Sequence, residues 1–383
     1  MILNLALSLA LACAAPQDAL PRDVSSSAAG LRSRHDLPAL AAAHWKDGAL
    51  VAFGFDGVRE RGSDVEVTAA DRFHLGSCTK SMTATLIAMF VEDEVLRWDS
   101  TVGEVFEELS KDMDPVWRDV TLTQLLTHRA GAPADLRGYA DGLGLVILGS
   151  KQPPPAMRLI LLEGVCAVPP KSPPGSAYLY SNNGYMIAAA MLERATGESW
   201  EDLIQARLFD PLGMTTAGFG PPSAKEELDQ PRGHWSNGKS ARRFDNPACY
   251  GPAGTVHASL EDWLKYLALH LAGARGEPTD LLRPESFTRL HEPVGTEPPY
   301  AMGWIITERP WAGGLALTHA GSNTAWFCTV WIAPAENMII LAASNQGGDA
   351  AAVATDEMVQ TLILKRAVES AQKAQKAKTD GED

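Results

Sequence analysis

A short stretch around residue 77 constrains the chain more than any other part of the sequence. Residues 73–75 are mostly apolar and predict the end of a strand, and Gly76 permits a tight turn. Apolar side chains then recur at helical spacing between residues 82 and 90. The stretch therefore predicts a strand that runs directly into a helix, with Ser77 at the junction.

Ser77 and Lys80 are three residues apart, so both side chains fall on one face of the first helical turn. The positive potential of a helix N-terminus favours an alkoxide on Ser77 and disfavours the protonated form of Lys80. A partly desolvated lysine is then a base for a serine nucleophile. The alternative is an N-capping serine beside a solvated lysine.

The Ser-x-x-Lys spacing occurs three times, and only its context separates the copies. Ser236 and Lys239 lie in a polar, glycine-containing segment with no helix behind it, and Ser370 and Lys373 belong to a charged C-terminal segment. Only the copy at Ser77 combines a strand, a turn and a helix, so it is the candidate nucleophile.

The length and charge of the chain limit what it can be. A chain of 383 residues fits one large domain or two fused ones and can bury a large core. Its net charge of -14 argues against nucleic acid or an anionic membrane surface as a partner.

Both ends of the chain differ from the rest. Residues 1–15 are apolar, too short to span a bilayer comfortably, and end in small residues with an A-x-A pattern. We predict a signal peptide at residues 1–14 and export to the periplasm or the extracellular space, with no membrane span. Lipid attachment at Cys13 is the alternative. Residues 369–383 are predicted to form a polar tail that is solvated or disordered.

Strand signals gather near the two ends of the chain. A helical segment from residue 37 and then a hairpin through residue 58 are predicted, with a buried strand at 49–55. Further strands and a closing helix are predicted late in the chain, the strands at 300–306, 325–332 and 338–343 and the helix at 356–368.

The middle of the chain is mainly helical. Short helices are predicted at 121–128, 185–195 and 200–208, whereas 219–250 is polar, lacks periodicity and predicts a long surface excursion. These patterns predict an α+β fold: an antiparallel sheet built from both chain ends, flanked by helices, with an inserted helical region at about 81–250.

The cysteines after residue 14 lack the close pairing of a zinc site. They are Cys78, Cys166, Cys249 and Cys328. Cys78 lies on a different helix face from Lys80, which favours a packing role. Disulfides are compatible with export, but the spacing does not pair the cysteines.

A second polar group follows a Pro/Gly-rich loop. Tyr180 and Asn182 are two residues apart, and loops between rigid flanks often display reacting groups. A lysine ammonium stabilises a nearby phenolate, so Tyr180 is placed to move a proton between Ser77 and a leaving group. Asn182 is placed to hold Lys80 or a substrate carbonyl. A structural tyrosine in a turn is the alternative.

A third group, His319, Gly321 and Ser322, is predicted just before a strand. Gly321 permits close backbone approach, and the N–H of Ser322 can pair with that of Ser77 to hold a developing oxyanion. His-x-Gly alone is weak evidence, because it also occurs at residues 74–76.

With these three groups in this order, the chain resembles the penicillin-recognising serine hydrolases. The branch it resembles holds class C β-lactamases, D-Ala-D-Ala carboxypeptidases, D-aminopeptidases and β-lactamase-like esterases. The resemblance covers nearly the whole chain after the leader. Further landmarks are Leu37-Pro38, Lys46-Asp47-Gly48, Leu125-Leu126-Thr127-His128, Pro174-Gly175, Pro211-Leu212-Gly213-Met214 and Ala253-Gly254.

The resemblance implies a role for each polar group. Ser77 is the acylated nucleophile, Lys80 its proton partner, and Tyr180 the general base and then acid. Asn182 contacts Lys80 or substrate, and residues 319–321 correspond to the family's Lys-Thr-Gly strand. The resemblance also implies one β-lactamase-like domain over residues 24–368, with no metal or organic cofactor. The expected substrates are small esters, amides or D-amino-acid peptides.

Departures from the family pattern narrow the range of expected substrates. His319 and Ala320 stand where many relatives have lysine and threonine, which help to hold a substrate carboxylate. Ala325 and Trp326 replace a later small-residue turn. We therefore expect an ester or amide hydrolase with poor β-lactam turnover. The alternatives are a D-Ala-D-Ala carboxypeptidase, a β-lactamase, or a catalytically silent member that binds or scaffolds.

Overall fold

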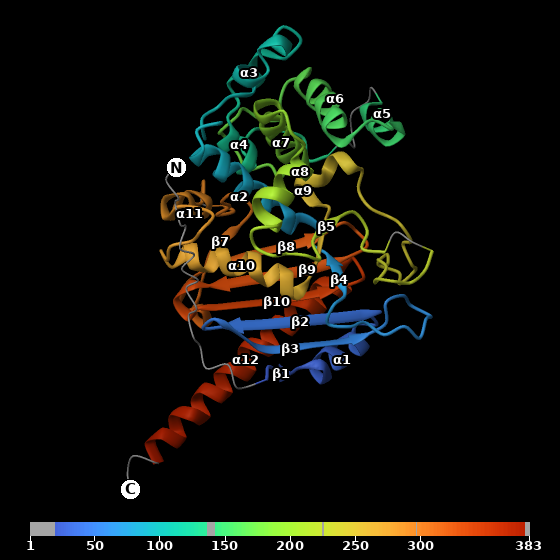
Figure 1. Ribbon diagram of the computed structural model, residues 1–383, viewed down its shortest axis with the longest axis vertical. Helices are drawn as coiled ribbons and strands as arrows, with labels where there is room; N and C mark the ends of the chain where they lie inside the picture. Colours follow the sequence, from blue (N-terminus) through green and yellow to red (C-terminus); the bar gives the residue numbers. More distant parts are fainter. Residues whose placement is uncertain (1–19, 136–141, 224–225, 296, 380–383) are drawn as a thin grey trace, which may run out of the picture.

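The computed structural model describes residues 20–135, 142–223, 226–295 and 297–379 (Figure 1). The predicted signal peptide at residues 1–14, including Cys13, lies outside these residues. Within the four described ranges, no helix is both long enough and apolar enough to cross a bilayer.

The strands form two sheets. Their bounds are β1 Arg22–Asp23, β2 Ala39–Lys46, β3 Ala49–Gly57, β4 Arg72–His74, β5 Gly218–Phe219, β6 Val256–Ser259, β7 Ile305–Arg309, β8 Gly314–Ser322, β9 Phe327–Ala333 and β10 Met338–Ser344. The larger sheet has the order β1-β3-β2-β10-β9-β8-β7, and the smaller one has the order β4-β6-β5. Neighbouring strands are antiparallel except β1 and β3, which are parallel.

The larger sheet joins the two ends of the chain, which confirms the predicted α+β fold. β2 pairs with β10 from Leu40 to Lys46, with Ala41 opposite Ala343. The strands on one side of this pair come from the first 57 residues, and those on the other come from residue 305 onward.

The prediction of a helical segment from residue 37 is wrong, because Ala39–Lys46 forms β2. Alanine favours helix when a segment stands alone. Here β2 pairs with β3 on one edge and with β10 on the other, and its first six residues are buried. Pairing on both edges and burial on both faces outweigh the local preference.

Helices cover both faces of the larger sheet and fill the inserted region above it (Figure 1). Their bounds are α1 Ser25–Arg34, α2 Thr79–Glu92, α3 Val102–Val105, α4 Leu122–Leu126, α5 Leu143–Gly149, α6 Pro154–Cys166, α7 Asn182–Thr196, α8 Trp200–Ile204, α9 Gly251–Gly254, α10 Leu260–Ala274, α11 Pro284–His291 and α12 Asp349–Thr379.

The two faces of the sheet belong to different core clusters. On β2, Leu40 and Ala42 pack with residues of α1 and α12, whereas Ala41 and Ala43 share the main core with α10. Successive side chains of a strand point to opposite faces, so these clusters lie on opposite sides of the sheet.

The end of the chain is more helical than predicted. α12 continues to Thr379 and projects away from the body of the molecule (Figure 1). Residues 369–379 of the predicted polar tail at 369–383 therefore extend this helix. Alanine, lysine and glutamine, which dominate this segment, are good helix formers.

The helix after Ser77 lies at the centre of the molecule. Every residue of α2 from Thr79 to Phe90 is buried, including the polar ones. α7, α8, α9 and α11 all contact this helix. Packing from several directions holds the first turn of α2 in one position.

A buried arginine joins three parts of the helical region. Arg158 on α6 has no exposed surface; its Nε and Nη2 donate to Glu193 on α7, and its Nη1 and Nη2 donate to Glu201 on α8. Glu193 also accepts the backbone N–H of Trp200 at 2.8 Å. The guanidinium therefore fixes the packing of α6 against α7 and α8.

Replacing Arg158 by methionine leaves Glu193 and Glu201 without their cation. We expect the free energy of unfolding to fall by about 3–5 kcal/mol, the usual cost of breaking a buried ion pair from one side. A urea titration followed by circular dichroism measures this change. The control is Arg194→Met, which breaks the half-exposed Arg194–Glu108 pair and is expected to cost less than about 1 kcal/mol. Equal effects of the two substitutions would contradict the prediction.

Candidate active site

The predicted strand, turn and helix around Ser77 are all present. β4 ends at His74, a 3-10 turn occupies Gly76–Cys78, and α2 begins at Thr79. Gly76 has a φ of 49°, and a Cβ there would lie 2.4 Å from the backbone nitrogen of Ser322. Glycine is therefore required for the end of β8 to lie this close to the Ser77 turn.

Four predicted residues meet in one hydrogen-bonded group. Lys80 Nζ lies 3.1 Å and the Tyr180 hydroxyl lies 2.8 Å from Ser77 Oγ. Lys80 Nζ also donates to Asn182 Oδ1 and to the carbonyl oxygen of Ala253, each at 2.7 Å. The hydroxyl, the amine and the phenol are thus within direct proton-transfer distance.

Burial controls the charge of Lys80. Its side chain has no exposed surface, and burial lowers the pKa of Lys80 to about 7, because an ammonium loses its hydration when it leaves water. Near neutral pH a large fraction of the enzyme therefore carries a neutral amine beside Ser77.

The structure corrects the expected charge of Tyr180. A lysine ammonium nearby is expected to stabilise a phenolate, but burial raises the pKa of Tyr180 well above its usual range. Desolvation of the phenolate outweighs the hydrogen bond to Ser77, which acts in the opposite direction. Tyr180 is therefore a neutral phenol in the resting site.

His128 holds the loop that carries Tyr180. Its Nδ1 accepts the backbone N–H of Ser181 at 3.1 Å, and its ring centroid lies 4.3 Å from that of Tyr180. The Ser181 hydroxyl in turn accepts the N–H of Gly184 at 3.0 Å and caps α7. Asn182 is consequently the first residue of a helix rather than part of a free loop.

The third predicted group lies at the end of β8 and, as predicted, just before a strand, which is β9. Gly321 lies against Leu75, which joins β4 to the Ser77 turn, since a Cβ on Gly321 would lie 2.0 Å from the carbonyl oxygen of Leu75. Ser322 lines the cavity next to Ser77. These positions bring the backbone of Ser322 beside the Ser77 turn, where its N–H is predicted to help hold an oxyanion.

His319 contacts Tyr300 and is not among the residues that line the cavity. Its Nε2 lies 3.3 Å from the Tyr300 hydroxyl, and its side chain is almost fully buried. Burial, and to a smaller extent the nearby Lys80, lower the pKa of His319 to about 4. The imidazole is thus neutral, and it does not line the cavity at Ser77.

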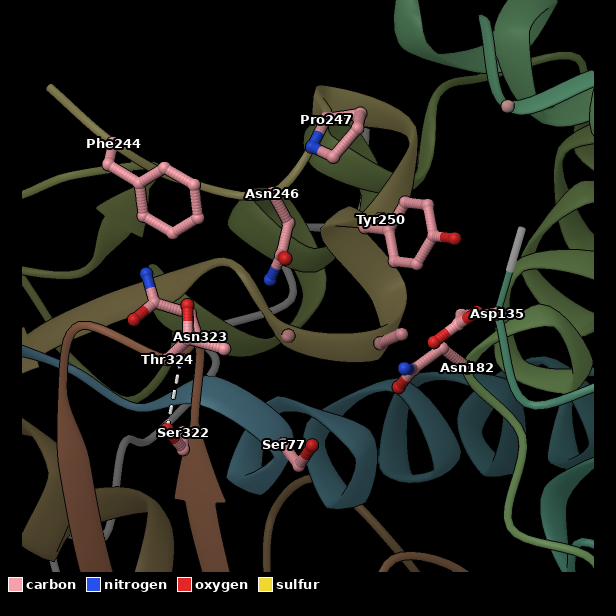
Figure 2. Close-up of a pocket in the computed structure, with 13 residues that line it drawn as sticks. Ser77, Asp135, Asn182, Phe244, Asn246, Pro247, Tyr250, Ser322, Asn323 and Thr324 are labelled. Carbon is pink, nitrogen blue, oxygen red and sulfur yellow. Dashed lines mark hydrogen bonds between the residues drawn. The ribbon is translucent and has the colours of Figure 1, made fainter. Parts of the chain in front are cut away.

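The cavity beside Ser77 has a volume of about 400 Å³. Figure 2 shows Ser322, Asn323 and Thr324 on one side of it and Asp135 and Asn182 on the other. The wall opposite Ser77 comes from the loop before α9 and consists of Phe244, Asn246, Pro247 and Tyr250 (Figure 2).

Sequence reasoning missed this opposite wall. Residues 219–250 are predicted to be a surface excursion, and much of the segment has no regular secondary structure. Its last part nevertheless returns to the site and lines the cavity. No periodicity or short motif in the sequence marks these residues.

The cysteines of the described residues are free and buried. Cys78 lies directly after Ser77, and its sulfur is 3.8 Å from that of Cys328 on β9. Burial raises the pKa of the Cys78 thiol well above its ordinary value. A buried neutral thiol fits the predicted packing role.

Sequence comparison gives a consistent assignment. The beta-lactamase family model matches residues 24–365. Penicillin-binding protein 4 of Amycolatopsis lactamdurans is 27% identical over 339 residues, which cover 85% of each chain. A D-aminopeptidase of Brucella anthropi is 28% identical over 320 residues, which cover 81% of this chain but only 56% of that relative.

Comparison of structures agrees at the level of the fold. The D-alanine carboxypeptidase AmpC from Burkholderia cenocepacia superposes with a TM-score of 0.69 at 22% identity, and the match covers 88% of this chain and 97% of that one. The family model spans nearly all of the described chain, from the strands before Ser77 to α12. The chain therefore belongs to the beta-lactamase family of serine hydrolases.

Proposed function

We propose that the protein is an exported hydrolase that cleaves an ester or an amide through an acyl-enzyme on Ser77. The observation that carries this proposal is the meeting of Lys80 Nζ and the Tyr180 hydroxyl at Ser77 Oγ, beside a cavity of about 400 Å³. Export rests on the apolar character of residues 1–15.

Lys80 is the base that accepts the Ser77 proton. A neutral amine has two N–H groups and one lone pair. Asn182 Oδ1 and the Ala253 carbonyl, both at 2.7 Å, take the two N–H groups, so the lone pair faces Ser77 Oγ. As Oγ attacks the substrate carbonyl carbon, its proton moves to Lys80, and the carbonyl oxygen becomes an oxyanion held by backbone N–H groups of Ser77 and Ser322.

Tyr180 is the acid for the leaving group. Its raised pKa keeps the phenol protonated 2.8 Å from Ser77 Oγ. When the tetrahedral intermediate collapses, the bond to the leaving alcohol or amine breaks, and that group takes the Tyr180 proton. The Lys80 ammonium then returns a proton to Tyr180. Water attacks the acyl-enzyme by the same steps in reverse, and the carboxylic acid product is released from Ser77.

The surroundings of the cavity favour substrates without a carboxylate next to the scissile bond. Among the described residues that line it there is no lysine or arginine. His319 is neutral and points to Tyr300. Ala320 is exposed on the same face of β8 as Ser322, because strand side chains alternate, and it offers no hydroxyl. An amide substrate is the second candidate, since one relative is a D-aminopeptidase.

Ser77→Ala removes the nucleophile. We expect kcat on p-nitrophenyl acetate to fall by about 10⁴-fold or more and covalent labelling by a fluorophosphonate to disappear. Ser236→Ala is the matched control, since Ser236 also precedes a lysine by three residues but is exposed outside the cavity. Labelling of another serine in Ser77→Ala, shown by mass spectrometry, would contradict the assignment.

The rate should depend on pH through Lys80. Its ammonium cannot accept a proton, so kcat/KM for p-nitrophenyl acetate should be low in acid, rise through pH 7 and level off above it. Lys80→Arg, whose side chain stays charged, should abolish turnover at every pH. An inflection near pH 10, the ordinary range of lysine, would show that Lys80 is not desolvated as the structure indicates.

A panel of three substrates tests the preference for uncharged groups. We expect kcat/KM to be highest for a p-nitrophenyl ester and lower for a D-Ala-D-Ala peptide and for nitrocefin. The expected difference is about 10- to 100-fold, because a hydrogen bond to a charged group contributes about 1.5–3 kcal/mol. Ala320→Thr should raise kcat/KM for the D-Ala-D-Ala peptide and for nitrocefin, which both carry a carboxylate, and should leave kcat/KM for the ester unchanged. Nitrocefin turnover equal to that of the ester would rule out this preference.

A further inference from the structure

A carboxylate that takes no direct part in the proposed chemistry lies behind the cavity wall. Asp245 stands between Phe244 and Asn246, which both line the cavity. Its own side chain is turned inward and is only 7% exposed. It therefore belongs to the layer of residues that supports the site.

One oxygen of Asp245 reaches the strand that leads to Ser77. Asp245 Oδ2 lies 2.9 Å from Nε2 of His74, which is fully buried on β4. His74 Nδ1 accepts the backbone N–H of Gly76 at 3.1 Å. Because Nδ1 accepts, the ring proton is on Nε2 and points to Asp245. The carboxylate thereby fixes both the imidazole tautomer and the backbone residue that precedes Ser77.

The other oxygen reaches the segment that follows Ser322. Asp245 Oδ1 accepts from Asn323 Nδ2 at 3.0 Å and from the backbone N–H of Asn246 at 2.7 Å. The amide of Asn323 is fixed from its other end, since its Oδ1 accepts the backbone N–H of Ala325 at 3.1 Å. Asn323 is almost fully buried, so water does not compete freely for these bonds.

We propose that Asp245 is a positioning residue, which holds the Ser77 turn and the Ser322 segment in register so that their two backbone N–H groups converge on the oxyanion. The inference rests on the proposed function. One carboxylate joins the two halves of the oxyanion site, through His74 on one side and Asn323 on the other. A misplacement of about 1 Å in such a site is enough to cost about 100-fold in rate.

Asp245→Asn is a sharp test, because the amide has the same shape but one of its two ends is a donor. If the new NH₂ group points to His74, it meets the N–H on Nε2 of that ring. The ring proton cannot shift to Nδ1, because Nδ1 already accepts the backbone N–H of Gly76. Directed at Asn323, it meets an amide whose orientation Ala325 fixes. Either orientation breaks one of the two links.

The experiment measures kcat and KM on p-nitrophenyl acetate and the affinity for phenylboronic acid, which forms a tetrahedral adduct with a nucleophilic serine. For Asp245→Asn we expect kcat and the boronate affinity to fall together by about 10- to 100-fold, with KM changed less than about threefold. Glu226→Gln, the same chemical change at an exposed residue of the same loop, is expected to leave all three unchanged.

A second variant guards against a folding defect. His74→Asn keeps an acceptor near Gly76 but loses the link to Asp245, so it should lower kcat and boronate affinity in the same way. The double variant should lose no more than the more damaged single variant, because both interrupt one path.

Wild-type kcat and boronate affinity in Asp245→Asn would overturn the inference, as would additive losses in the double variant. A lowered urea midpoint with unchanged boronate affinity per folded molecule would also overturn it, since that pattern marks a purely structural role. Absence of fluorophosphonate labelling at Ser77 in the wild type would instead overturn the proposed function, and this inference with it.

Discussion

The buried amine of Lys80 is the constraint on which the site depends. An ammonium that leaves water loses several kcal/mol of hydration, and only suitable partners compensate for that loss. The partners that the structure gives to Lys80 are a hydroxyl, an amide oxygen and a backbone carbonyl, and none of them is a carboxylate. These groups can accept the N–H donors of Lys80, but none carries the negative charge that would compensate an ammonium for its lost hydration. Burial therefore lowers the pKa of Lys80 to about 7, so that the neutral amine of the proposed mechanism is available near neutral pH.

The partners of Lys80 come from segments that are far apart in the chain. Asn182 opens α7, and Ala253 belongs to α9, which packs against both α2 and α7. The packing is tight, since a Cβ on Gly254 would lie 3.2 Å from the carbonyl carbon of Gly76. In the proposed mechanism, the inserted helical region and α9 directly after it therefore support the base, because they supply the acceptors that hold the buried Lys80.

Local patterns predicted the residues that meet at Ser77 but not the residues that support them. Ser77 and Lys80 are fixed by one helical turn, and Tyr180 and Asn182 by a cap and a rigid loop, so short-range spacing reveals them. The prediction of a helical segment from residue 37 is wrong, since alanine favours helix locally, whereas β2 is a strand that pairs with β3 and with β10, almost 300 residues away. Asp245 and Asn246 lie in an aperiodic loop, whose return to the site depends on tertiary contacts that no spacing encodes.

The joining of the chain ends in one sheet has a consequence for biosynthesis. The edge of β2 opposite β3 is covered only by β10, which ends at Ser344. While the residues between β3 and β10 are synthesised, the β2 edge of the hairpin keeps its backbone N–H and C=O groups unpaired. Contacts between residues so far apart in the sequence form slowly, whereas the intervening helices can assemble from local contacts. The larger sheet is accordingly completed only after the chain has been synthesised through β10.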